Sequence, residues 1–397
     1  MTMKLLIYSP MSIKYGGGVE SFILDLGKRL KDKSIDVTVV TSNYVGDEKR
    51  LDKVPLCPFH IYELRHKFFG GLLLPSYGTF RLLKRLVADA DITYFVNAFA
   101  LHDLIFLYIK QITGKRPMIN GIHAPLLTNS VLHNLYTKHI RYVLFRFFDA
   151  THVLNKDDAM TVRSLGVRRV YVIPYGVDVN VFKPAERNTR SETFKILFVG
   201  RLTYQKGVDI LCEAIKLLSY RTCFKRMSFT IIGSGSMESF VRTLTAKLSN
   251  VSFLGYLQRD LLPDIYRSHH ILVMPSRWET LGLTAIEAQA CGLPVIGTKV
   301  PGLKDVIVDG LTCELIPPED PLSLANSILK FYKMYNEDAE AFRHMAILSR
   351  RRASEVYDWN IVIESFCKML SDVLNESTHA CHLHSDVYYK LSLYSNR

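Results

Sequence analysis

Two glutamates eight positions apart, Glu279 and Glu287, are the side chains of this sequence most suited to chemistry. The first lies in an expected loop, and the second on a helix that we expect to begin near Gly282. The free N–H groups of a helix N-terminus suit a phosphate. Carboxylates repel phosphate but accept hydrogen bonds from sugar hydroxyls. A phosphate beside hydroxyls describes a nucleotide sugar.

An exposed position is the usual fate of glutamate and the plainer interpretation of both. Glu287, however, has alanine or isoleucine at positions 285, 286, 288 and 290. This small, apolar setting indicates a partly buried face, where a carboxylate must find hydrogen-bond donors. A ribose diol supplies two.

Arg201 and Lys206 are the cations best placed to complete such a site. They follow an expected strand and lie between Gly200 and Gly207. Two cations there can hold a diphosphate and stabilise it as it leaves. They could instead be solvated surface cations, but the flanking glycines and the strand-end position favour the diphosphate.

Three glycines and one histidine are further candidates. Gly17 and Gly18 follow the first expected strand, and their N–H groups could face an anion; a turn without ligand is the alternative. Gly233 lies in a Gly/Ser turn that could admit a nucleotide, although most such turns are only turns. His123 ends a strand, where it could serve chemistry or a sugar hydroxyl, but a lone histidine is more often structural.

The elements that must position these residues alternate between apolar strands and amphipathic helices. This pattern predicts an α/β fold of two doubly wound, Rossmann-like domains with parallel sheets. Such domains bind ligands at the carboxyl ends of their strands, so we expect a cleft between them. The expected strands are 4–10, 37–43, 92–97, 117–123, 151–155 and 170–177, then 195–202, 228–233, 251–255, 271–275 and 294–298. The polar stretch 186–194 is the expected linker.

Composition limits the classes of protein. The 397 residues include 48% hydrophobic and 22% charged residues, which is globular, and no apolar run is long enough to span a bilayer. Seven scattered cysteines and the absence of a signal peptide favour a cytoplasmic protein. Residues 1–190 carry 27 basic and 16 acidic side chains, whereas residues 191–397 are almost neutral. The basic half points to an anionic partner: nucleic acid, membrane or substrate.

An apolar and basic segment lies in this half. It contains Phe68, Phe69, Arg81, Lys84 and Arg85, and residues 138–148 have a similar character. Such segments suit an anionic membrane surface. A core helix with a solvated basic face is the alternative.

Together these residues resemble those of the family 4 glycosyltransferases of the GT-B fold. Glu279 to Glu287 resembles the family's E-x7-E motif, Arg201 with Lys206 its diphosphate-binding pair, and residues 173–184 the segment before its linker. The resemblance implies two domains, 1–185 and 195–357. The first would be completed by a C-terminal helix, 358–375. Residues 376–397 show no clear periodicity, so we expect an aperiodic, frayed tail there.

The resemblance also implies retaining transfer of a hexose from a nucleotide-diphosphate sugar. Arg201 and Lys206 would bind the diphosphate, Glu287 the ribose and Glu279 the sugar hydroxyls. His123 would lie near the transferred sugar. Backbone N–H groups of Gly282, Leu283 and Thr284 would help hold the donor. Basic side chains and a helix dipole would do the work of a metal, so neither metal nor cofactor is expected.

The expected acceptor is a lipid-linked or growing glycan at the cytoplasmic face of the membrane. A catalytically silent GT-B subunit that scaffolds a membrane assembly is the first rival. A nucleic-acid-binding protein is the second, but no such module is visible. Two departures from the family pattern concern the sugar: residues 301–305 lack the usual Gly-Gly, and Thr280-Leu281 replaces Pro-Phe or Gly-Phe.

Overall fold

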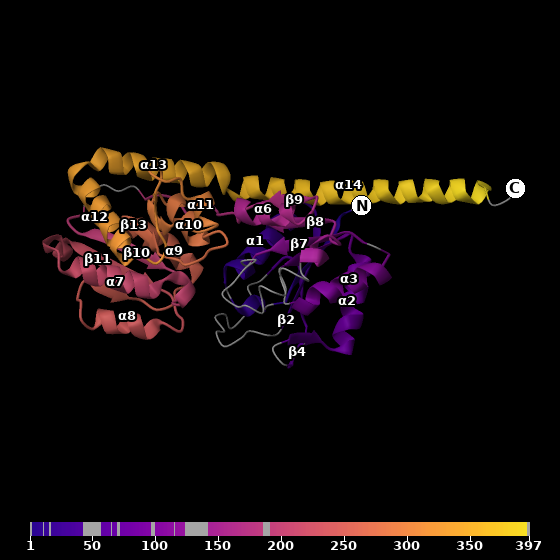
Figure 1. The fold of residues 1–397 in the computed structure, drawn as a ribbon, viewed down its shortest axis with the longest axis horizontal. Coiled ribbons are helices and arrows are strands. Elements are labelled where there is room, and N and C mark those ends of the chain that lie inside the picture. The colour runs from indigo at the N-terminus through magenta and orange to yellow at the C-terminus, as the bar shows by residue number, and fades with distance from the viewer. Residues whose placement is uncertain are drawn as a thin grey trace. The chain divides into compact units, whose positions relative to one another are not determined.

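The chain divides into two compact units (Figure 1). The first comprises Met1–Leu154, Asp158–Ile173 and Ile363–Arg397, and the second Asn155–Asp157 and Pro174–Val362. The computed structural model describes residues 2–10, 12–15, 17–42, 57–64, 66–69, 72–96, 100–114, 116–123, 142–185 and 191–394. For residues 15, 66–69, 72–75, 100–103, 142 and 377–394 it describes the backbone alone.

The first unit is built on a parallel sheet with the strand order β3-β2-β1-β6-β7-β8-β9. Its central strands are fully buried, as expected of a sheet covered on both faces. The strands are β1 (Lys4–Ser9), β2 (Asp36–Ser42), β3 (His60–Leu64), β6 (Ile92–Val96), β7 (Met118–Ile122), β8 (Ala150–Val153) and β9 (Val170–Val172).

Helices cover both faces of this sheet. Apolar residues of α2 and α3, among them Leu83 and Phe106, pack on one face with Phe95. On the other face, Phe22 of α1 contacts Phe366 of α14 with ring centroids 6.5 Å apart. The helices are η1 (Ile13–Tyr15), α1 (Gly18–Asp32), α2 (Tyr77–Asp89), α3 (Ala100–Ile112), α5 (Tyr142–Phe145), α6 (Lys156–Ser164) and α14 (Trp359–Tyr394).

The second unit contains a parallel sheet with the order β12-β11-β10-β13-β14-β15. Its strands are β10 (Phe194–Val199), β11 (Met227–Ile232), β12 (Val251–Phe253), β13 (Ile271–Met274), β14 (Val295–Thr298) and β15 (Glu314–Ile316). Its helices are η3 (Tyr204–Lys206), α7 (Val208–Ser219), η4 (Thr222–Arg226), α8 (Glu238–Thr245), η5 (Arg259–Leu261), α9 (Leu262–Ser268), α10 (Leu283–Ala290), α11 (Leu303–Val306), α12 (Pro321–Glu337) and α13 (Ala339–Val356).

Trp359 marks where the chain leaves α13. The preceding residue, Asp358, bridges to Val177, and the buried indole lies so close to Gly176 that a Cβ there would be 2.3 Å from its Cδ2. Only glycine leaves room for the ring at position 176.

The two sheets confirm the expected α/β class of two Rossmann-like domains. Four strands of the described residues were not anticipated: β3, β15, and the pair β4 (His66–Phe69) and β5 (Leu72–Pro75), which form an antiparallel hairpin. Residues 174–185, expected in the first domain, cluster with the second unit. Of the expected linker, residues 186–190 lie outside the described part of the chain.

The C-terminal tail also differs from expectation. We expected an aperiodic tail from residue 376, whereas α14 continues to Tyr394. No glycine or proline interrupts residues 359–394, so nothing in the backbone forces the helix to end earlier. Among the described residues, no helix is both long and apolar enough to cross a membrane.

Candidate active site

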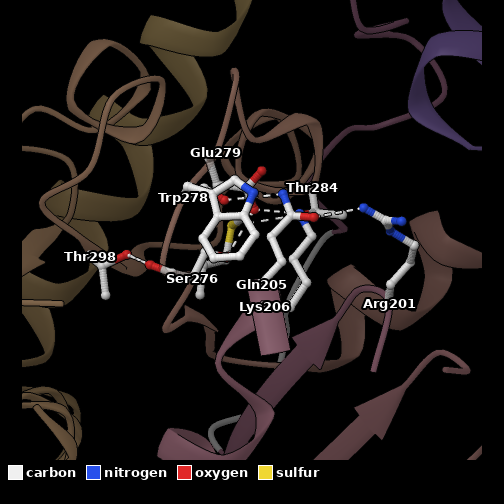
Figure 2. A network of polar contacts seen from close by, with 9 residues as sticks. Arg201, Gln205, Lys206, Ser276, Trp278, Glu279, Thr284 and Thr298 are labelled. Carbon is white, nitrogen blue, oxygen red and sulfur yellow. Dashed lines mark hydrogen bonds and ion pairs between the residues drawn. The ribbon is translucent and has the colours of Figure 1, made fainter. Parts of the chain in front are cut away.

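The carboxyl edge of the second sheet brings Lys206 and Glu279 together. The parallel strands β10 and β13 are neighbours, so the segments that follow them lie side by side. Lys206 ends η3, and its Nζ forms an ion pair with Oε1 of Glu279 (Figure 2). The two side chains are 18% and 6% exposed. Two residues that the sequence assigned to different parts of a donor thus form one ion pair, with Glu279 buried and Lys206 half-buried.

Gly207 explains how η3 comes so near the loop after β13. Its φ is +65°, and a Cβ there would lie 1.9 Å from the carbonyl oxygen of Pro275. Any other residue would push this backbone away from the loop. The glycine after Lys206 is therefore required for the lysine to reach Glu279.

Ser276, which the sequence did not single out, also holds Glu279. Its Oγ donates to Oε1 of the carboxylate at 2.9 Å. Thr298, at the end of β14, donates from its hydroxyl to the carbonyl oxygen of Ser276. Figure 2 shows this second contact continuing the network away from Lys206. Glu279 is thus oriented by its neighbours, as a ligand-binding carboxylate must be.

Arg201 joins the same network through Gln205. An Nη2 of Arg201 donates to Oε1 of Gln205 at 2.7 Å, and Nε2 of Gln205 donates to the carbonyl oxygen of Trp278 at 3.2 Å (Figure 2). Gln205 is a second residue that the sequence did not reveal. The structure therefore brings Arg201, Lys206 and Glu279 into one network.

The helix N-terminus expected near Gly282 is present in α10. Gly282 caps the helix in the left-handed conformation, at φ 90° and ψ 58°, and no side chain caps it. A Cβ at this position would also lie 2.6 Å from Cδ2 of Leu303. Leu283 and Thr284 form the first turn and are half-buried. Contact of their N–H groups with a donor remains a prediction.

The loop that departs from the family pattern lies against Glu279. Gly302 has φ +77°, and a Cβ there would be 2.8 Å from the carbonyl oxygen of Glu279 and 2.6 Å from the carbonyl carbon of Thr280. Both departures from the family pattern therefore meet at one place. A change in this loop reaches the Glu279 backbone directly.

Glu287 is buried, as its alanine-rich surroundings predicted, at 2% exposed. The ε-nitrogen of Arg259 donates to Oε1 of Glu287 at 2.8 Å, and the hydroxyl of Tyr266 donates to Oε2 at 3.1 Å. Burial and the adjacent carboxylate raise the pKa of Tyr266, which therefore stays a donor. Neither partner was anticipated, and ribose binding by Glu287 remains a prediction.

The remaining candidate glycines have local explanations. Gly233 has φ +142°, and a Cβ there would be 1.8 Å from the carbonyl oxygen of Gly200, so close packing alone requires glycine. Gly17 caps α1 in an extended conformation that any residue adopts, and Gly18 begins the helix. Donor contact at these three positions stays a prediction.

His123, one residue beyond β7, belongs to a buried polar chain in the first unit. The hydroxyl of Tyr94, in β6, lies 2.6 Å from Nε2 of His123 and 2.6 Å from Nδ1 of His152, in β8. Nε2 of His152 lies 2.7 Å from the carbonyl oxygen of Ile173. Burial lowers the pKa of His123 well below its usual value, and that of His152 to about 4.

This burial makes the stability of the first unit depend on pH. The unfolded chain protonates His152 near pH 6.5, whereas the folded chain resists protonation down to about 4. The unfolded state therefore binds more protons in this window. We expect the titration of His152 alone to lower the free energy of unfolding by about 2 kcal/mol between pH 7 and pH 5, and the lowered pKa of His123 adds a fall in the same direction.

Denaturant unfolding at the two pH values measures this effect. His152→Gln should make the dependence shallower by about this amount, because glutamine does not titrate, and leave the part that His123 contributes. An equal slope in the variant would assign the pH dependence to other groups.

Arg277, in the loop that carries Glu279, forms hydrogen bonds that link this loop to η3 and to the start of α7. Its guanidinium makes two hydrogen bonds to Asp209, of 2.8 and 2.7 Å, donates to the carbonyl oxygen of Tyr204 at 2.8 Å and stacks 3.6 Å above the Tyr204 ring. Its backbone N–H donates to Gln205 at 2.8 Å. The hydrogen bonds between the Arg277 guanidinium and the Asp209 carboxylate are the main reason that the pKa of Arg277 is raised and the pKa of Asp209 is lowered.

We expect Arg277→Lys to weaken donor binding and destabilise the fold by about 1–3 kcal/mol, because lysine cannot make the planar, bidentate contact. Thermal unfolding and donor titration measure the two effects. Arg351→Lys, at an exposed pair with Glu355, is the matched control. Unchanged donor affinity in Arg277→Lys would mean that η3 is held without Arg277.

The candidate membrane residues lie in the first unit. Arg81, Lys84 and Arg85 share the exposed face of α2, whose Leu83 and Val87 are buried. An exposed basic face of this kind fits both the membrane surface that we expected and the solvated helix that was the alternative, so membrane contact stays a prediction. Phe68 and Phe69 lie in β4, and their side chains fall outside the described part of the chain, as do residues 138–141.

The described residues include no group of three or more side chains placed to hold a metal ion.

Comparison with known proteins decides the family. A model described as Glycosyltransferase Family 4 matches residues 16–181, and one described as Glycosyl transferases group 1 matches residues 181–347. An uncharacterized glycosyltransferase of Methanocaldococcus jannaschii is 37% identical over 332 residues, which cover 82% of this chain and 86% of the relative. The chain belongs to the family 4 glycosyltransferases.

Two further relatives of this glycosyltransferase match to different extents. The gpi3 subunit of the phosphatidylinositol N-acetylglucosaminyltransferase of Schizosaccharomyces pombe is 25% identical, over 91% of this chain and 79% of its own length. The chain spans only about half (49%) of an uncharacterized protein in the cps region of Klebsiella pneumoniae, at 34% identity.

Solved structures support the fold. Anabaena HepE in complex with UDP and glucose aligns with a TM-score of 0.73 at 20% identity, covering 93% of this chain and all of HepE. At this identity the likeness shows the GT-B fold alone.

Proposed function

We propose that this enzyme transfers a hexose, with retention, from a nucleotide-diphosphate sugar to a lipid-linked or growing glycan acceptor. The observation that carries this proposal is the ion pair of the half-buried Lys206 with the buried Glu279 at the carboxyl edge of the second sheet. The pair puts a cation for the diphosphate beside a carboxylate for sugar hydroxyls. The uncapped N-terminus of α10 follows Glu279 by four residues and adds N–H groups and positive partial charge.

Each group has a role in this proposal. Arg201 and Lys206 hold the diphosphate and stabilise its charge as it leaves, Glu279 accepts from sugar hydroxyls and Glu287 from the ribose. Two cations and a helix dipole then stabilise the leaving group, so transfer needs no metal, and the leaving phosphate takes the proton of the acceptor hydroxyl.

Metal independence can be tested by adding EDTA. We expect the activity in EDTA to equal the activity in Mg²⁺. Complete loss in EDTA, restored by Mg²⁺, would contradict metal independence.

The donor is the first question for experiment. HepE was solved with UDP and glucose, which favours a UDP-sugar here. We would screen UDP-, GDP- and ADP-sugars by release of the nucleoside diphosphate. One accepted donor supports the proposal, and an inactive Glu279→Gln variant assigns the activity to this site. Binding of no donor in titration calorimetry would favour the silent-subunit alternative, which the gpi3 relative keeps open because it is named a subunit.

The acceptor and the membrane form the least direct part of the proposal. The gpi3 relative is named for a phosphatidylinositol substrate, and α2 presents three exposed cations. Two aromatic side chains near this face are also exposed, Tyr77 at 78% and Tyr108 at 58%, and Tyr108 stacks on Phe80 with ring centroids 6.1 Å apart. Aromatic and basic groups together suit the interface of an anionic, cytoplasmic leaflet.

Vesicle sedimentation tests this surface. The enzyme should bind vesicles containing 30% phosphatidylserine more tightly than pure phosphatidylcholine vesicles. An Arg81, Lys84 and Arg85 triple change to glutamine should remove most of the difference. A triple change of the exposed Lys216, Lys330 and Arg351 to glutamine is the charge-matched control. Equal binding of both variants to the phosphatidylserine vesicles would mean that these three residues of α2 do not form a membrane contact.

A further inference from the structure

Glu319 has a backbone conformation that residues with a side chain rarely adopt. It lies in the turn between β15 and α12, after Pro318 and before Asp320, the N-cap of α12. Its φ is +58°, and Ser34, at +60°, is the other non-glycine residue with a positive φ in the described part of the chain. A turn that needs a positive φ at its third residue usually has glycine or asparagine there. Strain of this kind is found mainly at functional sites.

The carboxylate of Glu319 lies near Arg277, in the loop that carries Glu279. Oε2 of Glu319 is 3.6 Å from Nε of Arg277, which is an ion pair but too long for a hydrogen bond. Both residues follow parallel strands of one sheet, β15 and β13, with β14 between them. The strained turn therefore places a carboxylate at the same edge of the sheet as the candidate active site.

The Nε–H of Arg277 is a donor that still needs this carboxylate. The Nη1 and Nη2 groups of Arg277 donate to Tyr204 and Asp209. Its Nε is buried and has no hydrogen-bond partner among the described residues. A buried donor without an acceptor is costly. The Arg277 side chain is 8% exposed, whereas that of Glu319 is 61% exposed, so the carboxylate can rotate toward the fixed guanidinium.

We propose that Glu319 is a positioning residue that accepts a hydrogen bond from the Arg277 Nε–H and thereby fixes the loop of residues 276–279 for the donor. A half-exposed ion pair adds little stability, so stability alone does not explain why this turn lacks glycine. Arg277 then links its loop to η3 and α7 and also to the turn before α12. The part of this inference that concerns the donor rests on the proposed function, whereas the hydrogen bond does not.

NMR of the arginine Nε–H groups labelled with ¹⁵N tests the hydrogen bond without any substrate. The Arg277 signal is the one that disappears in Arg277→Lys. Its proton should exchange with water roughly 5-fold faster in Glu319→Gly than in the native enzyme, the factor that corresponds to one hydrogen bond of ordinary strength. Ser34→Gly is the matched control and should leave this exchange unchanged. Equal exchange in Glu319→Gly and the native enzyme overturns the proposal.

Donor binding and thermal unfolding separate a positioning role from a structural one. Glu319→Gly and Ser34→Gly both relieve a positive φ, so neither should lower the Tm. Glu319→Gly alone should raise the Kd of an accepted donor, by about 2- to 5-fold, because the loop loses a partly exposed ion pair. Glu319→Gln keeps an acceptor oxygen and should restore part of the affinity.

Each other outcome has a distinct meaning. A lower Tm in Glu319→Gly would show that the glutamate serves the fold, and native donor affinity in Glu319→Gly would show that the loop needs no help from it; either result overturns the positioning role. If the native enzyme accepts no donor, the proposed function fails, while the exchange of the Arg277 Nε–H still decides whether Glu319 accepts from it.

Discussion

Replacing Lys206 by methionine is expected to lower the single-turnover rate of sugar transfer by roughly 100-fold, the usual effect of removing one group that stabilises developing charge. Methionine keeps the apolar length of the side chain but removes the cation beside Glu279. The leaving diphosphate then loses charge stabilisation just where the bond breaks. Rapid-quench measurement with saturating enzyme isolates this step from product release.

Two further variants sharpen the test. Lys216→Met changes an exposed lysine of α7, paired with Glu213, and should leave the rate unaltered. Glu279→Gln in the wild-type and Lys206→Met backgrounds gives the coupling energy between the two residues. Because they touch, the double variant should lose less than the sum of the single losses. A Lys206→Met enzyme with the native single-turnover rate would falsify the leaving-group role.

The second large effect is expected at Glu287. Glu287→Ala removes the carboxylate that accepts from both Arg259 and Tyr266. A hydrogen bond to a charged group is worth about 1.5–3 kcal/mol, so donor affinity should fall about 10- to 100-fold. Stability should fall too, by about 1–3 kcal/mol, because Tyr266 is fully buried and loses its acceptor.

Glu287→Gln separates the two consequences. The amide keeps the shape and an oxygen for Tyr266, so most of the stability should return. It lacks the charge that pairs with Arg259 and that strengthens a ribose hydrogen bond. Thermal unfolding and donor titration on both variants measure the difference. Native donor affinity in Glu287→Gln and Glu287→Ala would remove the ribose role and leave Glu287 as a structural partner of Arg259.

The sequence predicted the parts of this site that follow one another in the chain. Glu279, the start of α10 near Gly282 and the burial of Glu287 were all expected from a run of fewer than twenty residues. Strand ends were predictable for the same reason: a buried strand followed by glycine has a local signature. The two parallel sheets followed from the alternation of such segments.

The partners of these residues were not predictable in the same way. Arg259 lies 28 residues before Glu287, and His152 lies 58 residues after Tyr94, with no spacing pattern that joins them. Only sheet register and helix packing bring them together. The prediction of an aperiodic tail was wrong for a different reason: helix formation in residues 376–394 needs no hydrophobic period, only the absence of residues that break it.

The two tryptophans of the chain, Trp278 and Trp359, give this enzyme its own optical reporter. Trp278 lies between Arg277 and Glu279, accepts from Gln205 and has its ring centroid 6.3 Å from that of Tyr204. Trp359 is buried against Gly176, away from water. Donor binding should therefore change the emission of the first indole and leave the second as a constant background. Fluorescence titration of the unlabelled enzyme can then follow donor binding in real time, before any acceptor has been identified.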